Sequence, residues 1–171
     1  MKAISLWQPW ASLVAIKAKT IETRHWPAPS RMIGKRIAIH AAKRWTQDEE
    51  LLCFTEPFTS VLCEHFNITA TCASREHFLQ EAITCDLPKG AIVATAILAY
   101  CVPSEQVFAA SDPSISDSGW IKEANRVQAY PYEFAFGNLK PERYAWLLRD
   151  IEALPEPIPF KGAQGFFEVA L

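Results

Sequence analysis

The chain of 171 residues is long enough for one domain with a sizeable core, and its content of 50% hydrophobic and 21% charged residues is typical of a globular protein. A formal net charge of −2 argues against a protein that binds nucleic acid over its whole surface. No apolar run reaches the roughly 18 residues of a membrane-spanning helix, so we expect no membrane partner. We expect residues 1–171 to form a single domain.

The N-terminus and the cysteines both favour a cytoplasmic protein. Residues 1–10, MKAISLWQPW, lack the long apolar segment of a secretory signal. The cysteines are odd in number and irregularly spaced, which predicts reduced thiols and no disulfide framework. They are Cys53, Cys63, Cys72, Cys85 and Cys101.

Charge is distributed unevenly along the chain. Residues 1–45 contain nine Lys and Arg and one acid, Glu22, which is a net charge of +8, and the remaining residues carry −10. So basic a segment predicts a face that meets phosphate or another anion. The alternative is a basic segment that is neutralised by acids folded against it.

The first 45 residues predict three strands and one helix. Residues 2–7 alternate loosely and contain Ile and Trp, which predicts a strand, and the Gln-Pro pair that follows predicts the start of a helix. Residues 20–26, TIETRHW, predict a second strand, which the sequence PAPS ends. Residues 34–45 predict a third strand that is half buried, with Ile37, Ile39 and Ala41 on the core face and Arg36, Ala38 and His40 on the open face.

The middle of the chain predicts helices followed by a buried strand. TQDE at 46–49 has the T-x-x-E pattern of a helix capping box. Residues 47–85 are predicted to be helical in two pieces, with Pro57 interrupting the first and Ser74 capping the second. Residues 90–102, GAIVATAILAYCV, are the longest apolar β-branched run and predict a central strand buried on both faces.

The C-terminal third predicts loops and two closing strands. Residues 103–119 are rich in Ser, Asp and Pro and predict a loop, and residues 131–142 are irregular. Residues 143–154 and 165–171 predict strands joined by a tight connection rich in Pro and Gly. Because strands dominate both ends of the chain without βαβ alternation, the pattern predicts an α+β fold with a small mixed barrel.

Two stretches of this sequence carry a family resemblance. SLWQPWASLVAIKAKTIETRHWP, followed by GKRIAIHAAKRW, resembles the ASCH domain, which is named for its homology to a transcriptional coactivator. The G-x-K-x-x-E-x-R motif of that family matches at Lys19, Glu22 and Arg24. Lys17 stands in the place of the glycine, so we expect the tight turn that glycine allows to be made differently here. FGNLKPERYAWLL and LPEPIPFKGAQGFFEV resemble the ends of longer bacterial and phage members, and the resemblance covers residues 3–45 and 88–171.

The resemblance implies a PUA-like fold, a small mixed β-barrel with flanking helices and, in this chain, a helical insertion at about 46–86. It also implies a positively lined cleft that binds RNA or a nucleotide. Catalysis varies among such proteins: some are ribonucleases, and a smaller group hydrolyses the amide of N4-acetylcytidine. In that group a Lys and a Thr three residues later form the catalytic pair, whereas this chain has Lys19 followed by Glu22.

The motif residues are the first candidate site residues. In an extended segment Glu22 and Arg24 share a face, and Lys19 can join them from a helix-to-strand turn. Such a cluster can present guanidinium and ammonium donors to a phosphate or a base, or it can be a structural ion pair. For a ribonuclease, Glu22 or His40 would be the base, and Lys19 or Arg24 would stabilise the negative charge of the phosphorane.

Other residues are candidates for binding the ligand. Gln8 and Trp10 could read and stack a base, although the helical spacing of Trp10 favours the core, and we also expect Trp7 in the core. His40 is a candidate for phosphate binding or a hydrogen-bonded structural histidine. The loop at 161–165 allows a close approach to a ligand or is a plain turn. The candidate binding residues are Gln8, Trp10, Arg24, His25, Arg36, Lys43, Lys161, Gly162 and Gln164.

No metal site or cofactor is expected, because Cys63, His65, Cys72, His77 and Cys85 fit no zinc spacing. A divalent metal stays open as an alternative, although the sequence does not indicate one. The preferred function is binding of RNA or a nucleotide. The alternatives are a hydrolase acting on RNA or on an acylated nucleoside, and a protein-interaction domain that docks a partner through residues 46–86.

Overall fold

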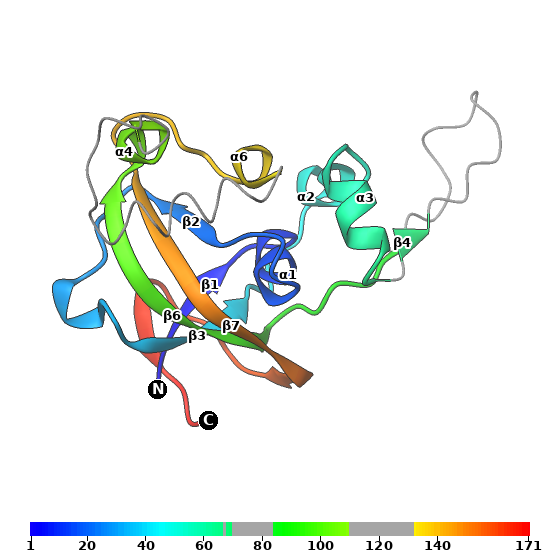
Figure 1. Ribbon diagram of the computed structural model, residues 1–171. Helices are drawn as coiled ribbons and strands as arrows, with labels where there is room; N and C mark the ends of the chain where they lie inside the picture. The colour runs from blue at the N-terminus through cyan, green and yellow to red at the C-terminus, as the bar shows by residue number, and fades with distance from the viewer. Residues whose placement is uncertain (67, 70–83, 110–131) are drawn as a thin grey trace.

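Six strands form one curled, mixed sheet in a computed structural model that describes residues 1–66, 68–69, 84–109 and 132–171 (Figure 1). The sheet order is β2–β7–β6–β3–β1–β8. β1 and β3 are parallel, and the other neighbouring pairs are antiparallel. The strands are β1 (Lys2–Leu6), β2 (Ile21–Arg24), β3 (Arg36–Ala41), β6 (Ala91–Pro103), β7 (Tyr144–Pro159) and β8 (Phe166–Glu168). The fold is therefore the predicted α+β fold with a mixed sheet that curls into a half-barrel.

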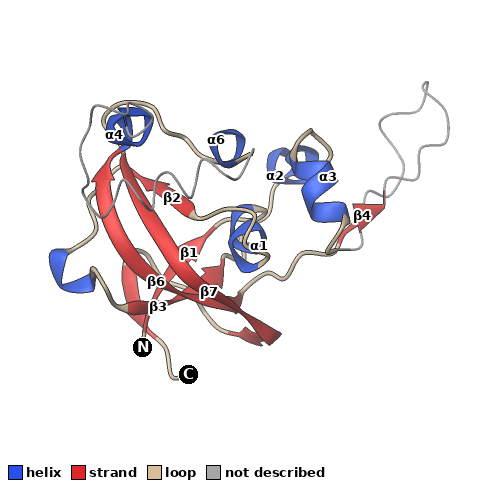
Figure 2. Ribbon diagram, in the orientation of Figure 1, coloured by secondary structure: helices blue, strands red, loops and turns tan. Residues whose placement is uncertain are grey.

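Short helices lie against the sheet and beside it (Figure 2). Helix α1 (Trp10–Ala15) places Ala11 and Val14 in the core of the sheet and Leu13 in a second apolar cluster. The other helices of the described residues are η1 (Ser30–Met32), α2 (Gln47–Leu52), α3 (Phe58–Cys63), α4 (Ser104–Ala109) and α6 (Glu133–Phe136). Because α1 is buried on both sides, it joins the sheet to α3 and α6. Among the described helices, none is long and apolar enough to span a membrane.

An aromatic cluster lies between the two outer strands of the sheet. Trp26 follows β2, Phe166 belongs to β8, and their ring centroids are 6.1 Å apart. Both rings contact Trp146 of β7, with centroid distances of 4.7 Å to Trp26 and 5.6 Å to Phe166. Trp146 is fully buried. These rings fill the gap between the sheet edges that the curl brings together.

Strand β3 is buried on both faces, so the prediction of a half-buried strand was wrong. Residues from Ile37 to Ala41 are at most 2% exposed. On the face expected to be open, Ala38 packs with Ala3, Ile92 and Val169, which come from other strands and the C-terminus. The C-terminal segment covers this face through Val169. The sequence of β3 itself cannot indicate burial by a segment so far away along the chain.

The insertion at 46–86 is only partly helical. The capping box is confirmed, because the Thr46 N–H donates to Glu49 Oε2 at 2.8 Å, and α2 and α3 lie on either side of Pro57. However, β4 (Ile68–Thr69) pairs with β5 (Thr84–Cys85), where a helix was predicted. Both segments contain β-branched residues, which favour strands. Ser74 lies outside the described residues.

Two further predictions for the C-terminal third need correction. Residues 104–109 form α4 instead of a loop, and 133–136 form α6. Strand β7 does not stop before the prolines but continues to Pro159, paired with β6 through Ala91 and Ile92. Its pairing with β2 covers only Tyr144 to Leu147. Beyond that point no strand among the described residues pairs with this side of β7, so proline's missing N–H costs no ladder hydrogen bond there.

Candidate functional site

The turn that leads into the motif is made by a lysine in a left-handed conformation. Lys17 has φ +65°, and the backbone N–H groups of Lys17 and Ala18 donate to the carbonyls of Val14 and Leu13, both at 2.9 Å. This arrangement ends α1 and turns the chain into β2. Lys17 itself adopts the left-handed conformation that glycine favours, so a lysine makes the tight turn in this chain.

The Glu22 and Arg24 side chains form an ion pair on the inner face of the curled sheet. Glu22 Oε1 is 2.9 Å from Arg24 Nε, although the Nε–H has no well-aligned acceptor, so the contact is electrostatic. Arg24 Nη2 donates to the carbonyl of Ser5 at 2.6 Å. Ser5 belongs to β1, which is not a neighbour of β2 in the sheet. Arg24 therefore reaches across the inside of the curl.

Lys19 lies in a buried environment, and its charge acts on Glu133, as the charge of Glu22 does. It is 1% exposed, and its ammonium group donates to the Ile21 carbonyl. The Glu133 carboxylate of α6 accepts the backbone N–H groups of Thr20, at 2.9 and 3.0 Å, and of Ile21. Burial raises the pKa of Glu133 above its usual value, and the nearby charge of Lys19 opposes this rise.

The sequence reasoning missed Glu133. An acid between aromatic residues, as in YPYEFAF, was the available signal. The structure thus places Lys19 with Glu133, and Glu22 with Arg24.

His40 is a buried histidine with both ring nitrogens engaged. Nε2 is 3.0 Å from the Phe160 carbonyl, and Nδ1 is 3.0 Å from Ser5 Oγ. Because a carbonyl only accepts, we assign the proton to Nε2, and the Ser5 hydroxyl then donates to Nδ1. Burial lowers the pKa of His40, which agrees with a neutral ring.

Gly162 packs directly on this histidine. A Cβ atom at Gly162 would lie 2.6 Å from His40 Nδ1 and 2.7 Å from Ser5 Oγ. The glycine therefore allows the 161–165 loop to lie against β1 and β3. The loop was predicted to allow a close approach to a ligand, and here it closely approaches the protein's own side chains.

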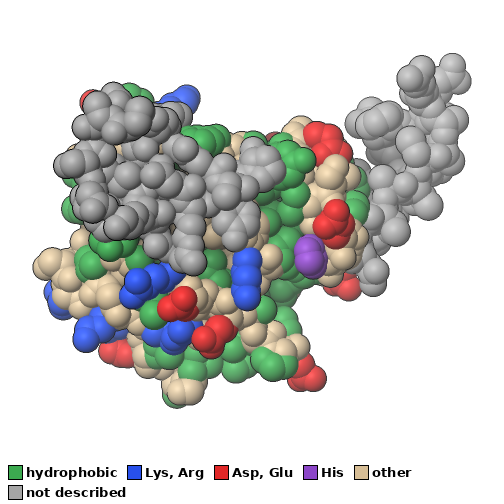
Figure 3. Space-filling view, in the orientation of Figure 1, with side chains coloured by type: hydrophobic (Ala, Val, Ile, Leu, Met, Phe, Trp, Pro, Cys, Tyr) green, Lys and Arg blue, Asp and Glu red, His purple; other side chains and the backbone are tan. Residues whose placement is uncertain are grey.

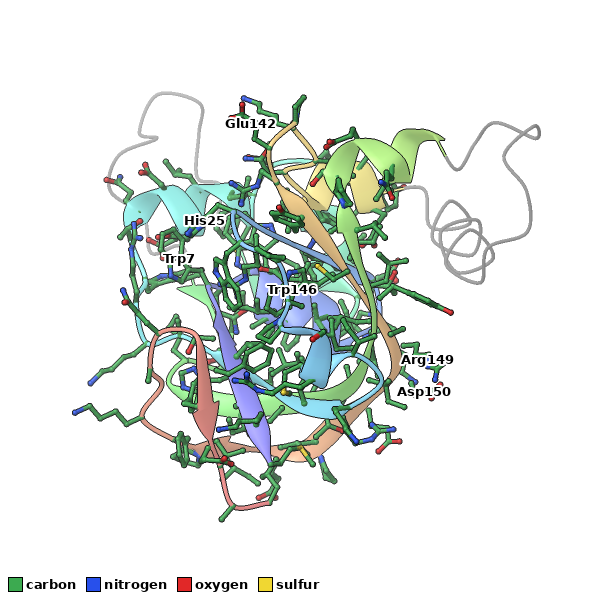
Figure 4. The ribbon with its side chains drawn as sticks, turned by 90° about the vertical axis from the view of Figure 1, so that its left-hand side faces the viewer. Trp7, His25, Glu142, Trp146, Arg149 and Asp150 are labelled. Carbon is green, nitrogen blue, oxygen red and sulfur yellow. The ribbon has the colours of Figure 1, made fainter. Side chains whose placement is uncertain are left out.

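Segments far apart in the sequence meet at Ser5. Its carbonyl accepts from Arg24, and its hydroxyl lies 3.0 Å from His40 Nδ1 and 3.3 Å from the Ala163 carbonyl. Exposed residues follow each of these contacts along the chain, and Figure 4 shows Trp7 and His25 on one side of the molecule. We call the exposed residues next to the contacts of Ser5 and His40 the basic end, and they are Trp7, His25, Lys43, Arg44, Lys161 and Gln164.

Several predicted binding residues have other contacts. Gln8 is fully buried, with Nε2 donating to the Pro88 carbonyl at 2.5 Å and Oε1 accepting from the Ser12 N–H at 3.1 Å. Trp10 Nε1 donates to the Phe136 carbonyl at 2.8 Å, so the preferred interpretation of Trp10 as a packed residue agrees with its position. Trp7 was expected in the core but is 47% exposed.

Arg36 lies at the other end of β3 from the basic end. Its Nη2 is 3.2 Å from a carboxylate oxygen of Glu152, and its Nη1 donates to Thr95 Oγ1 at 3.0 Å. On the face shown in Figure 3, basic side chains likewise lie beside acidic ones. Positive charge there is therefore partly neutralised.

Within the described residues, no three His, Cys, Asp or Glu side chains gather as metal ligands would. Cys72 and His77 lie outside those residues. In helix α3 of the insertion, the Phe58 and Leu62 side chains lie in an apolar cluster with Leu13 and Phe136. These apolar side chains therefore pack against the body of the protein.

Comparison with known proteins identifies a family and solved structures that are similar to the chain. The model of the ASCH domain matches residues 4–134 of the chain. The crystal structures of the ASCH protein from Zymomonas mobilis and of a point mutant of it are 18% identical to the chain. They cover 99% of this chain and 87% and 89% of their own, with TM-scores of 0.45 and 0.46. Comparison with curated protein sequences finds no significant match.

Proposed function

Because the chain belongs to the ASCH domain family, whose PUA-like fold is often linked to RNA binding, we propose that it binds RNA or a nucleotide at the basic end. The observation that carries this proposal is the convergence at Ser5. Arg24 and the loop that begins at Lys161 both contact Ser5. Lys43 lies just after the end of β3, three residues beyond His40. Cationic side chains from distant parts of the chain therefore share one end of the sheet.

The exposure of these cations supports a role in binding phosphate. Lys43 and Lys161 are exposed, so their ammonium groups can reach a phosphate without displacing other parts of the protein. Arg24 is half buried and held by Glu22 and Ser5, which fixes its guanidinium group. Because the chain as a whole carries −2, attraction of RNA must come from such a local surface.

Binding of fluorescently labelled RNA at several salt concentrations tests this proposal. We expect the affinity to fall steeply as salt rises, and Lys43→Ala and Lys161→Ala each to reduce the salt slope by about 1. Lys35→Ala removes the same charge from an exposed site that precedes β3, and we expect it to behave as wild type. Absent or salt-independent binding would overturn the proposal, and so would an equal effect of the Lys35 control.

A second candidate function, hydrolysis of RNA or of an acylated nucleoside, is favoured by the surroundings of Glu133. Its pKa is raised by burial, and the charges of Lys19 and Glu22 both act on it. Because Glu133 is 1% exposed and its carboxylate accepts the N–H groups of Thr20 and Ile21, it would hold Lys19 and the start of β2 in place for the reaction and would not touch the substrate itself.

The test is incubation with N4-acylated cytidines and with RNA, followed by chromatography. We expect Glu133→Gln to abolish turnover and Glu152→Gln, at an exposed carboxylate, to retain it. If the wild type gives no product, this candidate fails while the binding proposal stands.

A further inference from the structure

Trp7 is a large aromatic side chain held out in solvent between two buried residues. The indole is 47% exposed, whereas Leu6 is 2% and Gln8 is 0% exposed. Trp7 belongs to no hydrophobic cluster among the described residues. Burial of an indole is strongly favourable, so most tryptophans are buried. An indole that is exposed on a fixed backbone therefore suggests a surface that binds a ligand.

The guanidinium group of Arg44 lies over the Trp7 ring, with Cζ 3.8 Å from the ring centroid. Arg44 Nη2 is also 3.6 Å from Glu49 Oε1. Glu49 is buried and caps α2 through the Thr46 N–H, so the carboxylate beside Arg44 is itself fixed. The indole and the guanidinium group are therefore positioned as a pair before any ligand arrives.

A second pair of the same kind lies on the adjoining segments. Lys89 Nζ is 4.5 Å from the centroid of the Trp45 ring. The segments that carry the two pairs are joined, because Gln8 donates to the Pro88 carbonyl and the Gly90 N–H donates to the Ala41 carbonyl at 2.8 Å. Two indole–cation pairs therefore lie on the segments that follow β1 and β3 and precede β6.

We propose that Trp7, positioned by Arg44, is a stacking platform for an unpaired base, so that the RNA bound at the basic end is single-stranded there. This inference rests on the proposed function and adds the class of RNA to it. An indole face stacks on any base, but in a duplex the base faces are already occupied by their neighbours. The cations of the basic end would hold the adjoining phosphates.

The experiment measures dissociation constants of the full chain for a short single-stranded RNA and for a blunt duplex of the same length. We expect the wild type to prefer the single strand. Trp7→Ala should weaken single-strand binding about 10-fold and leave duplex binding unchanged, and Trp7→Phe should recover most of the loss. Arg44→Ala should weaken single-strand binding more than Arg149→Ala does, because Arg149 lies on the opposite side of the molecule from Trp7 (Figure 4).

Ile158→Ala is the control for loss of exposed apolar surface, because Ile158 is 43% exposed near the end of β7. Thermal unfolding checks that each variant folds. If Trp7→Ala is unstable, the quenching of tryptophan fluorescence by the single strand, compared between wild type and Trp7→Phe, gives the same information. We expect the quenching to be larger in the wild type.

The outcomes separate the two proposals. If Trp7→Ala binds the single strand as wild type does while Lys43→Ala and Lys161→Ala bind it more weakly, the stacking inference is wrong and the proposed function stands. Parallel loss of duplex binding in Trp7→Ala would also overturn the stacking inference. If the wild type binds neither RNA, both proposals fail.

Discussion

Ser5 connects the parts of the candidate site, although nothing in its local sequence marks it. Its partners Arg24, His40 and Ala163 lie 19, 35 and 158 residues away along the chain. A serine within a strand has no spacing or neighbouring residue type that indicates such contacts. The predicted residues Arg24 and His40 were identified individually, but Ser5 shows how they are joined.

At Gly162 the missing side chain is a packing requirement. We expect Gly162→Ala to lower the free energy of unfolding by about 1–3 kcal/mol, because its Cβ would overlap the Ser5 hydroxyl and the His40 ring. Gly137→Ala is the matched control, since the atoms nearest to its Cβ are 3.4 Å or more away. Urea unfolding measures both. A stability of Gly162→Ala equal to that of the control would contradict the close packing.

His40 predicts a pH dependence of stability. Its pKa in the folded protein is below the ordinary value of 6.5, so the unfolded chain takes up a proton at higher pH than the folded one. The stability that His40 contributes is therefore present above that pH and lost as the pH falls through it. We expect the free energy of unfolding of the wild type to exceed that of His40→Gln by more at about pH 7.5 than at about pH 5. A difference that does not change with pH would show that His40 does not titrate as inferred.

At the scale of the element, the turn that follows α1 contains a residue, Lys17, whose backbone conformation is strained. A non-glycine residue at φ +65° brings its Cβ close to the backbone, and Lys17 is exposed, so little packing compensates. We expect Lys17→Gly to raise the free energy of unfolding by about 1 kcal/mol.

The matched control for this prediction is Lys35→Gly, an exposed lysine that does not have a positive φ. Glycine there only adds freedom to the unfolded chain, so we expect a loss of about 0.5–1 kcal/mol. Thermal or urea unfolding compares the two variants. If Lys17→Gly destabilises the protein as much as Lys35→Gly does, the turn is not strained.

At the scale of the whole molecule, the curl of the sheet brings its outer strands together. Trp26, Trp146 and Phe166 fill the gap between β2 and β8, and Arg24 crosses the inside of the curl to Ser5. The geometry of the candidate site therefore depends on contacts between the two ends of the chain.

We expect Phe166→Ala to lower the free energy of unfolding by about 2 kcal/mol, because it removes a half-buried ring that stacks on Trp146. Ile158→Ala, at an exposed position, should change it by less than about 0.5 kcal/mol. Chemical denaturation followed by tryptophan fluorescence would measure both changes. Equal stabilities would show that the aromatic cluster does not hold the sheet edges together.

Features that depend on a few neighbouring residues could be predicted from the sequence. The first strands, the start of α1, the capping box at Thr46 and the apolar run of β6 were all predicted, because alternation, proline placement and side-chain caps act locally. The pairing of Glu22 with Arg24 followed from their shared face in a strand. The family resemblance, confirmed over residues 4–134, added the fold.

The tertiary structure was needed to show which side chains are buried and which charged groups pair. It exposed Trp7, buried Lys19 beside Glu133, covered both faces of β3 and extended β7 to Pro159. The physical reason is that burial and charge pairing depend on contacts set by the order of strands in the sheet. That order places β1 beside β3 and β8, strands that are widely separated in the sequence.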